Sequence, residues 1–468
     1  MNDPGHGPGN DIFAARRRQQ AEMYGDSIDV LATKVQQLMG LGVPDLADII
    51  GLSVPMLHKL LNAERVGIGN QVAMGRLTRL QEFADQLISG EAGRDEIPLT
   101  LAQIKASTTP ARPSRVTALA GKEPVGSQTR NPTSPRRPVV APGTGEAPVI
   151  TPTSLGYARS VVGRHVLPTP TYRWPLIERF TRTETWIKHE NHSPTGAFKV
   201  RGGLNFLERL RVSGMPAPSG LISATRGNHG QSLAFAGSRY GVPVTIVVPE
   251  GNNPDQVDAM DGHGAEVIEH GADFQAAREH AAQLAGERGL LMVPPFHAWL
   301  VEGIATYAAE LHEAVSGLDT IYVPVGMGSG ICANILVRDL LGLRTEIVGV
   351  VSAGAPAYAL SFEAGRPVST DSADTFVDGV ACRTPDPVAV EIINRGAARI
   401  VRVSEEEAAE AMALTYRTTH NLAEPAGSLA LAGMLADRDQ LEGRRIALVQ
   451  TGGNCDLDTL TRVTADIT

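Results

Sequence analysis

The sequence has few cysteines and no long apolar run, and both shortages narrow the class of protein. Its three cysteines, Cys332, Cys382 and Cys455, are too scattered for a disulfide framework or a zinc site. No stretch of about 18 apolar residues is long enough to cross a membrane, and the amino terminus lacks the apolar core of a signal peptide. We therefore expect a cytoplasmic protein with no membrane partner.

Charge is unevenly distributed along the chain. The 468 residues carry a formal net charge of -9, which disfavours nucleic acid as the partner of the whole chain. Between residues 101 and 149 the balance reverses, because seven Lys/Arg and two Asp/Glu lie among eight prolines. This composition predicts a flexible linker, since it buries too little surface to offset its ordering entropy. We expect four segments: a disordered terminus (1–25), a helical domain (26–97), a linker (98–150) and a larger α/β domain (151–468).

The helical domain has the apolar spacing of packed helices. Ala47, Gly51, Leu57 and Leu60 fall where a helix-turn-helix needs a small residue, a turn glycine and two core leucines. This spacing resembles phage-repressor-type DNA-binding domains and predicts DNA contact through residues 44–65. The groove-facing positions would be Ser53, Val54, His58 and Lys59. Residues 1–100 hold nine Lys/Arg against thirteen Asp/Glu, the wrong sign for phosphate binding, so a helical docking or dimerisation unit is the alternative.

From about residue 151, short β-branched runs alternate with helical stretches. Four runs are continuously apolar, as buried strands are: TIVVPE (245–250), TIYVPVG (320–326), EIVGVVSA (346–353) and RIALVQTGG (445–453). This alternation predicts a two-lobed, mostly parallel α/β enzyme.

One lysine stands in an unusually apolar setting, in the stretch ENHSPTGAFKVRGG (190–203). Lys199 lies between Phe198 and Val200, with glycines on both sides. A partly desolvated lysine amine serves as a nucleophile and a base, and an aldehyde cofactor would supply its partner. The alternative is a structural lysine that pairs with a carboxylate or extends to water.

A glycine-rich loop supplies a candidate phosphate site. It consists of Gly326, Met327, Gly328, Ser329 and Gly330, between a strand and a helix. Glycines let backbone N–H groups point into one cavity, and the helix amino end favours an anion. No Lys-Ser/Thr pair follows the loop, so it is not a nucleoside-triphosphate P-loop, and it lacks the acidic ribose partner of a dinucleotide fold.

Two further stretches offer polar groups. The turn from Thr225 to Gln231 opens an apolar helix, where Asn228 and His229 present donors to a phenolate or a carboxylate. A simple helix cap facing water is the alternative. Thr451 ends the last strand before two glycines, at the strand end where ligands of open α/β sheets bind.

Together these stretches resemble the fold type II pyridoxal-phosphate enzymes, within the serine/threonine dehydratase group. LPTPTYRWPL (167–176) and EPAGSLALAG (424–433) agree with the same family. The resemblance covers roughly residue 151 to the carboxyl terminus. It implies a tryptophan synthase β-like fold whose smaller lobe spans about 200–292, pyridoxal 5′-phosphate as the cofactor, and a homodimer.

The resemblance also implies a role for each motif. Lys199 would hold the cofactor covalently and remove the substrate Cα proton, with Phe198 against the pyridine ring. Asn228 would bind the phenolic oxygen, Thr451 would face the pyridine nitrogen, and the loop 326–330 would bind the 5′-phosphate. The substrate carboxylate would lie in the turn formed by Thr225, Arg226, Gly227 and His229.

Three departures from the family pattern narrow these expectations. Ala197 replaces the serine usual before Phe-Lys, although the neighbouring positions are intact. Arg226 stands where racemases carry a serine as second base, and arginine cannot act as that base near neutral pH. It would contact a substrate carboxylate, including the side chain of 3-hydroxyaspartate, or else face solvent. Val351 and Ser352 replace an acid that binds a divalent cation in some relatives, so no metal site is expected.

These expectations converge on a pyridoxal-phosphate-dependent ammonia-lyase for L-threonine, L-serine or a related β-hydroxy amino acid. A neutral hydroxyl at Thr451 makes a weaker electron sink than a carboxylate would, which favours prompt loss of a β-leaving group. The alternatives are β-replacement within the same fold and a transcription regulator that senses an amino acid or the cofactor.

Overall fold

The computed structural model describes residues 17, 20, 26–62, 71–89, 92–106, 139–215 and 218–465. The chain divides into two compact units, Met1–Arg130 and Asn131–Thr468. The expected disordered terminus lies outside the described residues, apart from Arg17 and Gln20, and so does most of the expected linker. Across the described ranges, no helix combines the length and apolarity that a membrane crossing needs.

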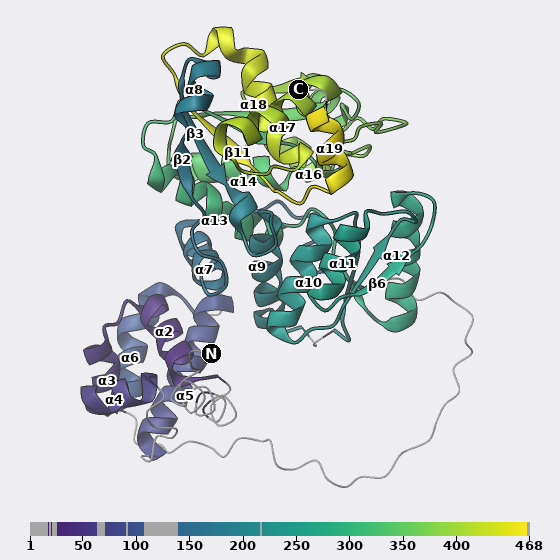
Figure 1. Ribbon diagram of the computed structural model, residues 1–468. Coiled ribbons are helices and arrows are strands. Elements are labelled where there is room, and N and C mark those ends of the chain that lie inside the picture. The colour runs from purple at the N-terminus through teal and green to yellow at the C-terminus, as the bar shows by residue number, and fades with distance from the viewer. Residues whose placement is uncertain are drawn as a thin grey trace, which may run out of the picture. The chain divides into compact units, whose positions relative to one another are not determined.

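The first unit is helical, as predicted, and Figure 1 draws it at the purple end of its colour scale. Its α-helices include α2 Ile28–Met39, α3 Val43–Ile50, α4 Val54–Leu61, α5 Gln71–Ser89 and α6 Ile97–Ala106. Gly51 makes the turn between α3 and α4 with a φ of 85°, a left-handed conformation that favours glycine. Ala47, Leu57 and Leu60 are buried in the core. DNA contact through residues 44–65 stays a prediction.

The boundary expected after residue 97 is wrong. Helix α6 continues to Ala106 because Ile104 is buried in the same apolar core as α2 to α5. At the other end of the expected linker, Val139–Val140 forms strand β1, which pairs with β7 of the larger unit. The second unit therefore begins its sheet structure before residue 151.

The smaller lobe of the second unit contains a five-stranded parallel sheet. Its order is β1, β7, β4, β5, β6, with bounds Val139–Val140, Leu291–Met292, Leu221–Ala224, Val244–Val248 and Glu266–Glu269. Helices α9 (Lys199–Val212) and α10 (Asn228–Tyr240) contribute to the apolar core on one face, and α12 (Phe274–Arg288) to that on the other. Adjacent residues Leu221 and Ile222 belong to these two opposite cores, which explains why the strands are apolar throughout.

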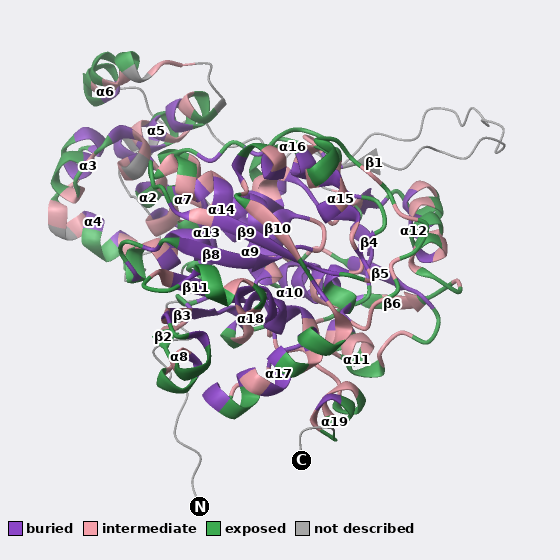
Figure 2. Ribbon diagram, turned by 90° about the horizontal axis from the view of Figure 1, so that it is seen from above, coloured by how far each residue is buried: buried purple, intermediate pink, exposed green. Residues whose placement is uncertain are grey.

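The larger lobe contains a six-stranded sheet in the order β10, β9, β8, β11, β3, β2. The bounds are Arg399–Val403, Glu346–Ser352, Thr320–Pro324, Arg445–Gln450, Glu184–His189 and Thr171–Arg173. Only the edge strand β2 runs antiparallel to its neighbour. The four predicted strands correspond to β5, β8, β9 and β11, and Figure 2 shows these central strands buried.

Three adjacent strands of the larger sheet lead into three of the predicted motifs. β8, β11 and β3 are neighbours and parallel, so their carboxyl ends meet at one edge. The glycine loop follows β8, Thr451 follows β11, and the segment that contains Lys199 follows β3. Helix α13 (Ala298–Ala314) packs against both α9 and α14 (Ser329–Leu340). This arrangement brings motifs more than 250 positions apart to one place.

Candidate active site

Lys199 is the first residue of α9 and is held by contacts on both sides. The backbone N–H of Phe198 donates to the Thr451 carbonyl (3.0 Å), and Ser232 Oγ donates to the Lys199 carbonyl (2.5 Å). The Phe198 ring packs edge-on against Tyr307, with ring centroids 5.9 Å apart. These contacts fix the lysine backbone at the carboxyl edge of the larger sheet.

The structure brings every predicted cofactor-binding residue into one pocket. The pocket is lined by Phe198, Lys199, Asn228, Pro324, Gly326, Met327, Gly328, Ser329, Gly330, Gly379, Val380, Glu424, Ala426 and Thr451. The residues predicted to hold the substrate do not line it themselves, but they flank Asn228 at its edge: Thr225, Arg226, Gly227 and His229.

Two glycines of the loop, Gly326 and Gly328, lie too close to their neighbours to be replaced by larger residues. A Cβ on Gly326 would lie 2.3 Å from the Gly379 carbonyl oxygen. Gly328 has a φ of 89° and caps the amino end of α14, and a Cβ there would lie 2.8 Å from the Ala389 Cβ. The two glycines therefore leave their backbone open to the pocket, and the helix amino end favours an anion there.

The turn before α10 is polar but largely buried. Thr225 Oγ1 accepts from the Gly227 N–H (3.2 Å), which shapes the turn. Burial, together with the charge of the nearby Lys199, lowers the pKa of His229 to about 3, so the imidazole is neutral. Arg226 is exposed and donates to Asp378 Oδ1 (3.2 Å) across the mouth of the site.

The place of one acidic residue in the site, Glu424, was not predicted from the sequence. Its carboxyl group is buried, and both of its oxygens accept from Asn228 Nδ2, at 2.8 and 3.0 Å. Burial raises the pKa of Glu424 to about 7, although the Asn228 hydrogen bond and the Lys199 charge oppose the rise. The signal was present in EPAGSLALAG, but that stretch does not show which residue faces the pocket.

Lys199 lies in an environment that disfavours the charged form of its amine. Its pKa is lowered by burial, and Glu424 opposes this shift. The Nζ lies 5.5 Å from the centroid of the Phe198 ring. Among the described residues no carboxylate forms an ion pair with it. This environment makes the neutral amine, the form suited to nucleophilic attack, easier to reach than it is in water.

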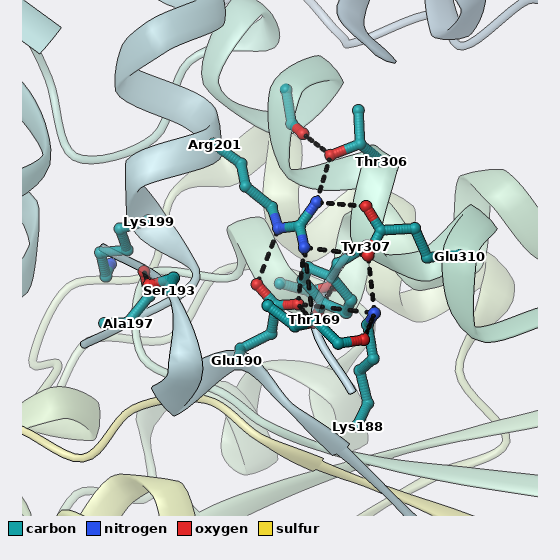
Figure 3. A network of polar contacts seen from close by, with 12 residues as sticks. Thr169, Lys188, Glu190, Ser193, Ala197, Lys199, Arg201, Thr306, Tyr307 and Glu310 are labelled. Atoms are coloured by element: carbon teal, nitrogen blue, oxygen red, sulfur yellow. Dashed lines mark hydrogen bonds and ion pairs between the residues drawn. The ribbon is translucent and has the colours of Figure 1, made fainter. Parts of the chain in front are cut away.

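A second cation on the same helix has the opposite environment. Arg201 is fully buried and donates to Glu190 (2.8 and 3.0 Å) and Glu310 (2.6 and 2.9 Å). Lys188 Nζ completes this cluster with a 2.6 Å bond to Glu310. Figure 3 shows Arg201 reaching into these carboxylates while Lys199 lies apart from them. The cluster ties α9 to β3 and α13 and so anchors the helix that begins with Lys199.

The pocket fits a phosphorylated aromatic aldehyde on three observations. Thr451 Oγ1 is buried and has no hydrogen-bond partner in the described part of the chain, so it can serve a ring nitrogen. The glycine loop lines the pocket at the amino end of α14 and offers a site for a phosphate. Lys199 supplies an amine that can react with the aldehyde. These features define a two-lobed α/β protein with a site for a covalently held cofactor.

Comparison with known proteins identifies the family. Residues 162–452, more than half of the chain, match the family model for the pyridoxal-phosphate dependent enzymes. The chain belongs to this family. It is 36% identical to the L-threonine ammonia-lyase of Geobacter sulfurreducens, over 59% of this chain and 69% of that protein.

One solved structure shares the fold of this chain, and a further relative shows how much of its own length the match covers. The processed form of threonine deaminase isoform 2 from Solanum lycopersicum matches this chain with a TM-score of 0.62 and 26% identity. The match covers 70% of this chain and 98% of the deaminase chain. The L-threonine dehydratase biosynthetic IlvA of Haemophilus influenzae is 30% identical over 62% of this chain. The match covers only 57% of the length of that relative.

Proposed function

We propose that this chain is a pyridoxal-phosphate-dependent ammonia-lyase. Its substrate would be L-threonine, L-serine or a related β-hydroxy amino acid, and its products a 2-oxo acid and ammonia. The observation that carries the proposal is Lys199, an amine of lowered pKa in one pocket with a glycine loop and an unpartnered hydroxyl. Similar proteins named L-threonine ammonia-lyase and L-threo-3-hydroxyaspartate ammonia-lyase support the reaction type.

The cofactor would be held by groups already in place. Backbone N–H groups of Gly326 to Gly330 would bind the phosphate, and Phe198 would pack against the ring. Asn228 would bind the phenolic oxygen, and the neutral Thr451 hydroxyl would face the ring nitrogen. When bound, pyridoxal phosphate supplies the electron sink that makes the substrate Cα proton acidic.

Lys199 would then act as the base. Burial favours its uncharged amine, which can accept the Cα proton. The Cα–H bond breaks as its proton passes to Lys199, and the Cβ–O bond breaks as the hydroxyl takes up a proton and leaves as water. A water molecule then hydrolyses the C–N bond of the remaining imine, which gives the 2-oxo acid and ammonia. The arginine at position 226 cannot accept a proton from the opposite face, which disfavours racemisation.

Substrate selection would rest on the turn before α10. The backbone of Thr225 to His229 would bind the substrate carboxylate, since the turn lies at the amino end of a helix. Neutral His229 would leave Lys199 without an added neighbouring positive charge. Arg226 at the mouth would recognise a second carboxylate, as in 3-hydroxyaspartate.

The labelling pattern of the lysines tests the proposal. From residue 139 onward the sequence has only two lysines, Lys188 and Lys199. We expect borohydride treatment of the full-length protein with pyridoxal phosphate to label Lys199, while Lys188, bound to Glu310, serves as an internal control. Lys199→Ala should abolish the label and reduce 2-oxo acid release from L-threonine by at least about 1,000-fold. A label on Lys188 alone, or turnover that survives in the variant, would contradict the proposal.

Two partner assignments accompany this function as proposals. Residues 44–65 would contact DNA through the exposed Ser53, His58 and Lys59, which lie at the start of α4 or on its surface. A second copy of the chain would complete a homodimer. Both rest on the family resemblances of the sequence.

A further inference from the structure

Glu424 is enclosed so that its carboxyl group can face only the pocket. It caps the amino end of α18 (Pro425–Asp437), and its backbone N–H donates to the Gly452 carbonyl (3.1 Å). A Cβ on Gly452 would lie 2.5 Å from Glu424 Oε1, so only glycine leaves room for the carboxyl group there. The surrounding backbone therefore fixes this acid beside the cofactor site.

The Asn228 amide is held in one orientation between two partners. Asn454 Nδ2 donates to Asn228 Oδ1 (2.7 Å) and also to the Thr195 carbonyl (2.8 Å). Asn228 Nδ2 must then point the other way, and there it donates to both oxygens of Glu424. An ionised Glu424 thus engages the same amide hydrogens that the phenolic oxygen of the cofactor would need.

Burial, rather than the charges around Glu424, disfavours its ionised form. The titratable groups that face it are Lys199, Asp378 and Cys455. Asp378 is a like charge, and burial raises the pKa of the Cys455 thiol to about 12, so it is neutral. Lys199 is the one nearby cation among these groups, and burial lowers its pKa. An unpaired buried carboxylate is costly, and protonation removes that cost.

We propose that Glu424 takes up one proton from solvent as the cofactor binds, and that the neutral carboxyl group frees Asn228 to donate to the cofactor's phenolic oxygen. Glu424 thereby acts as a positioning residue of the cofactor site. One O–H bond forms on Glu424, and one N–H of Asn228 changes its acceptor. This inference rests on the role proposed for Asn228 and does not depend on which amino acid is the substrate.

Proton uptake on binding tests the inference without any turnover. The probe is pyridoxine 5′-phosphate, which carries an alcohol in place of the aldehyde and cannot bond to Lys199. Calorimetry on the full-length, cofactor-free protein, in buffers of different ionisation enthalpy, counts the protons taken up. At pH 8 we expect the unmodified protein to take up about one proton more than Glu424→Gln, whose neutral amide resembles the protonated acid in size and shape.

The pH dependence of affinity gives an independent measurement. Above pH 7 the affinity of the unmodified protein should fall, relative to Glu424→Gln, by up to about 10-fold per pH unit. The same comparison in a Lys199→Ala background separates Glu424 from the amine.

Equal proton uptake in the unmodified protein and Glu424→Gln would overturn the inference. If the variant fails to fold, an absence of proton uptake by the unmodified protein at pH 8 would overturn it just as well. Failure of the lyase proposal has a different signature, because it would appear as absent turnover with proton uptake intact.

Discussion

Lys199 and Arg201 lie two residues apart on one helix and have opposite environments. Arg201 is fully buried, and carboxylates and hydroxyls surround its guanidinium. Lys199 faces a pocket, where the nearby acid Glu424 bonds to Asn228 instead. The first cation is matched and structural, and the second is left available for chemistry. The comparison teaches that local charge pairing, rather than burial alone, distinguishes the environments of these two cations.

The same contrast holds for the acids that accompany them. Burial opposes ionisation of Glu310, but the hydrogen bond and charge of Arg201, with the charge of Lys188, outweigh it and lower the pKa of this carboxyl. Burial raises the pKa of Glu424 to about 7, because no comparable partner is present. The helix α9 thus carries one cation in a neutralised ion cluster and another near an acid that forms no ion pair with it among the described residues.

Replacing each cation by methionine is the strongest way to break this comparison. Arg201→Met should lower the free energy of unfolding by about 3–5 kcal/mol, because Glu190 and Glu310 lose their partner. Lys199→Met should leave it unchanged or raise it by about 1 kcal/mol, since a poorly paired buried amine is removed. Urea unfolding followed by tryptophan fluorescence measures both, because Trp174, Trp186 and Trp299 all lie in the second unit. Equal losses in the two variants would contradict the distinction.

Replacing each acid by glutamine sharpens the comparison through its pH dependence. Glu424 stays protonated to a higher pH in the folded protein than in the unfolded chain. The free energy of unfolding therefore falls as pH rises from 4.5 to about 7. Glu424→Gln should therefore stabilise the cofactor-free protein by at most about 3 kcal/mol at pH 8 and by little near pH 4.5.

Glu310→Gln should show the opposite sign. The folded-state pKa of Glu310 is lowered, so its contribution is present above its unfolded pKa and is lost as pH falls through the folded value. The variant should lose about 3 kcal/mol at pH 8, and the loss should shrink in acid. Unfolding midpoints measured from pH 8 to below pH 4.5 test both variants, because the change for Glu310 falls below its unfolded pKa of 4.5. If the stability changes of Glu424→Gln and Glu310→Gln had the same sign and pH dependence, the proposed difference between the environments of the two acids would be wrong.

The site could be predicted where its chemistry lies in continuous motifs. Lys199, the glycine loop and Thr451 each follow an apolar strand, and the structure brings them together because those strands are neighbours. The contact between Asn228 and Glu424 joins positions 196 residues apart and could not be predicted in this way. It depends on the two lobes meeting across the pocket, which no local spacing records.

The fold was predictable to a similar extent. The buried strands were correctly predicted because their apolar runs are long and continuous. The two-residue strand β1 follows a proline-rich stretch and is stabilised by pairing with β7, so its own composition gave no sign of it. Helix α6 was missed for a related reason, since its buried Ile104 packs against helices distant in sequence.

The exposed pair of Arg226 and Asp378 should give the smallest effect on stability. Their side chains are 47% and 61% exposed, so Arg226→Ala should change the free energy of unfolding by less than about 1 kcal/mol, as should the similarly exposed control Arg288→Ala.

The test variant Arg226→Ala and the control Arg288→Ala should differ in substrate preference. If Arg226 recognises a second carboxylate, Arg226→Ala should lower kcat/KM for L-threo-3-hydroxyaspartate about 10-fold and leave L-threonine nearly unchanged. Asp378→Asn, which removes the competing acid, should shift the same ratio the other way. An unchanged ratio in both variants would place Arg226 with the solvent-facing surface cations.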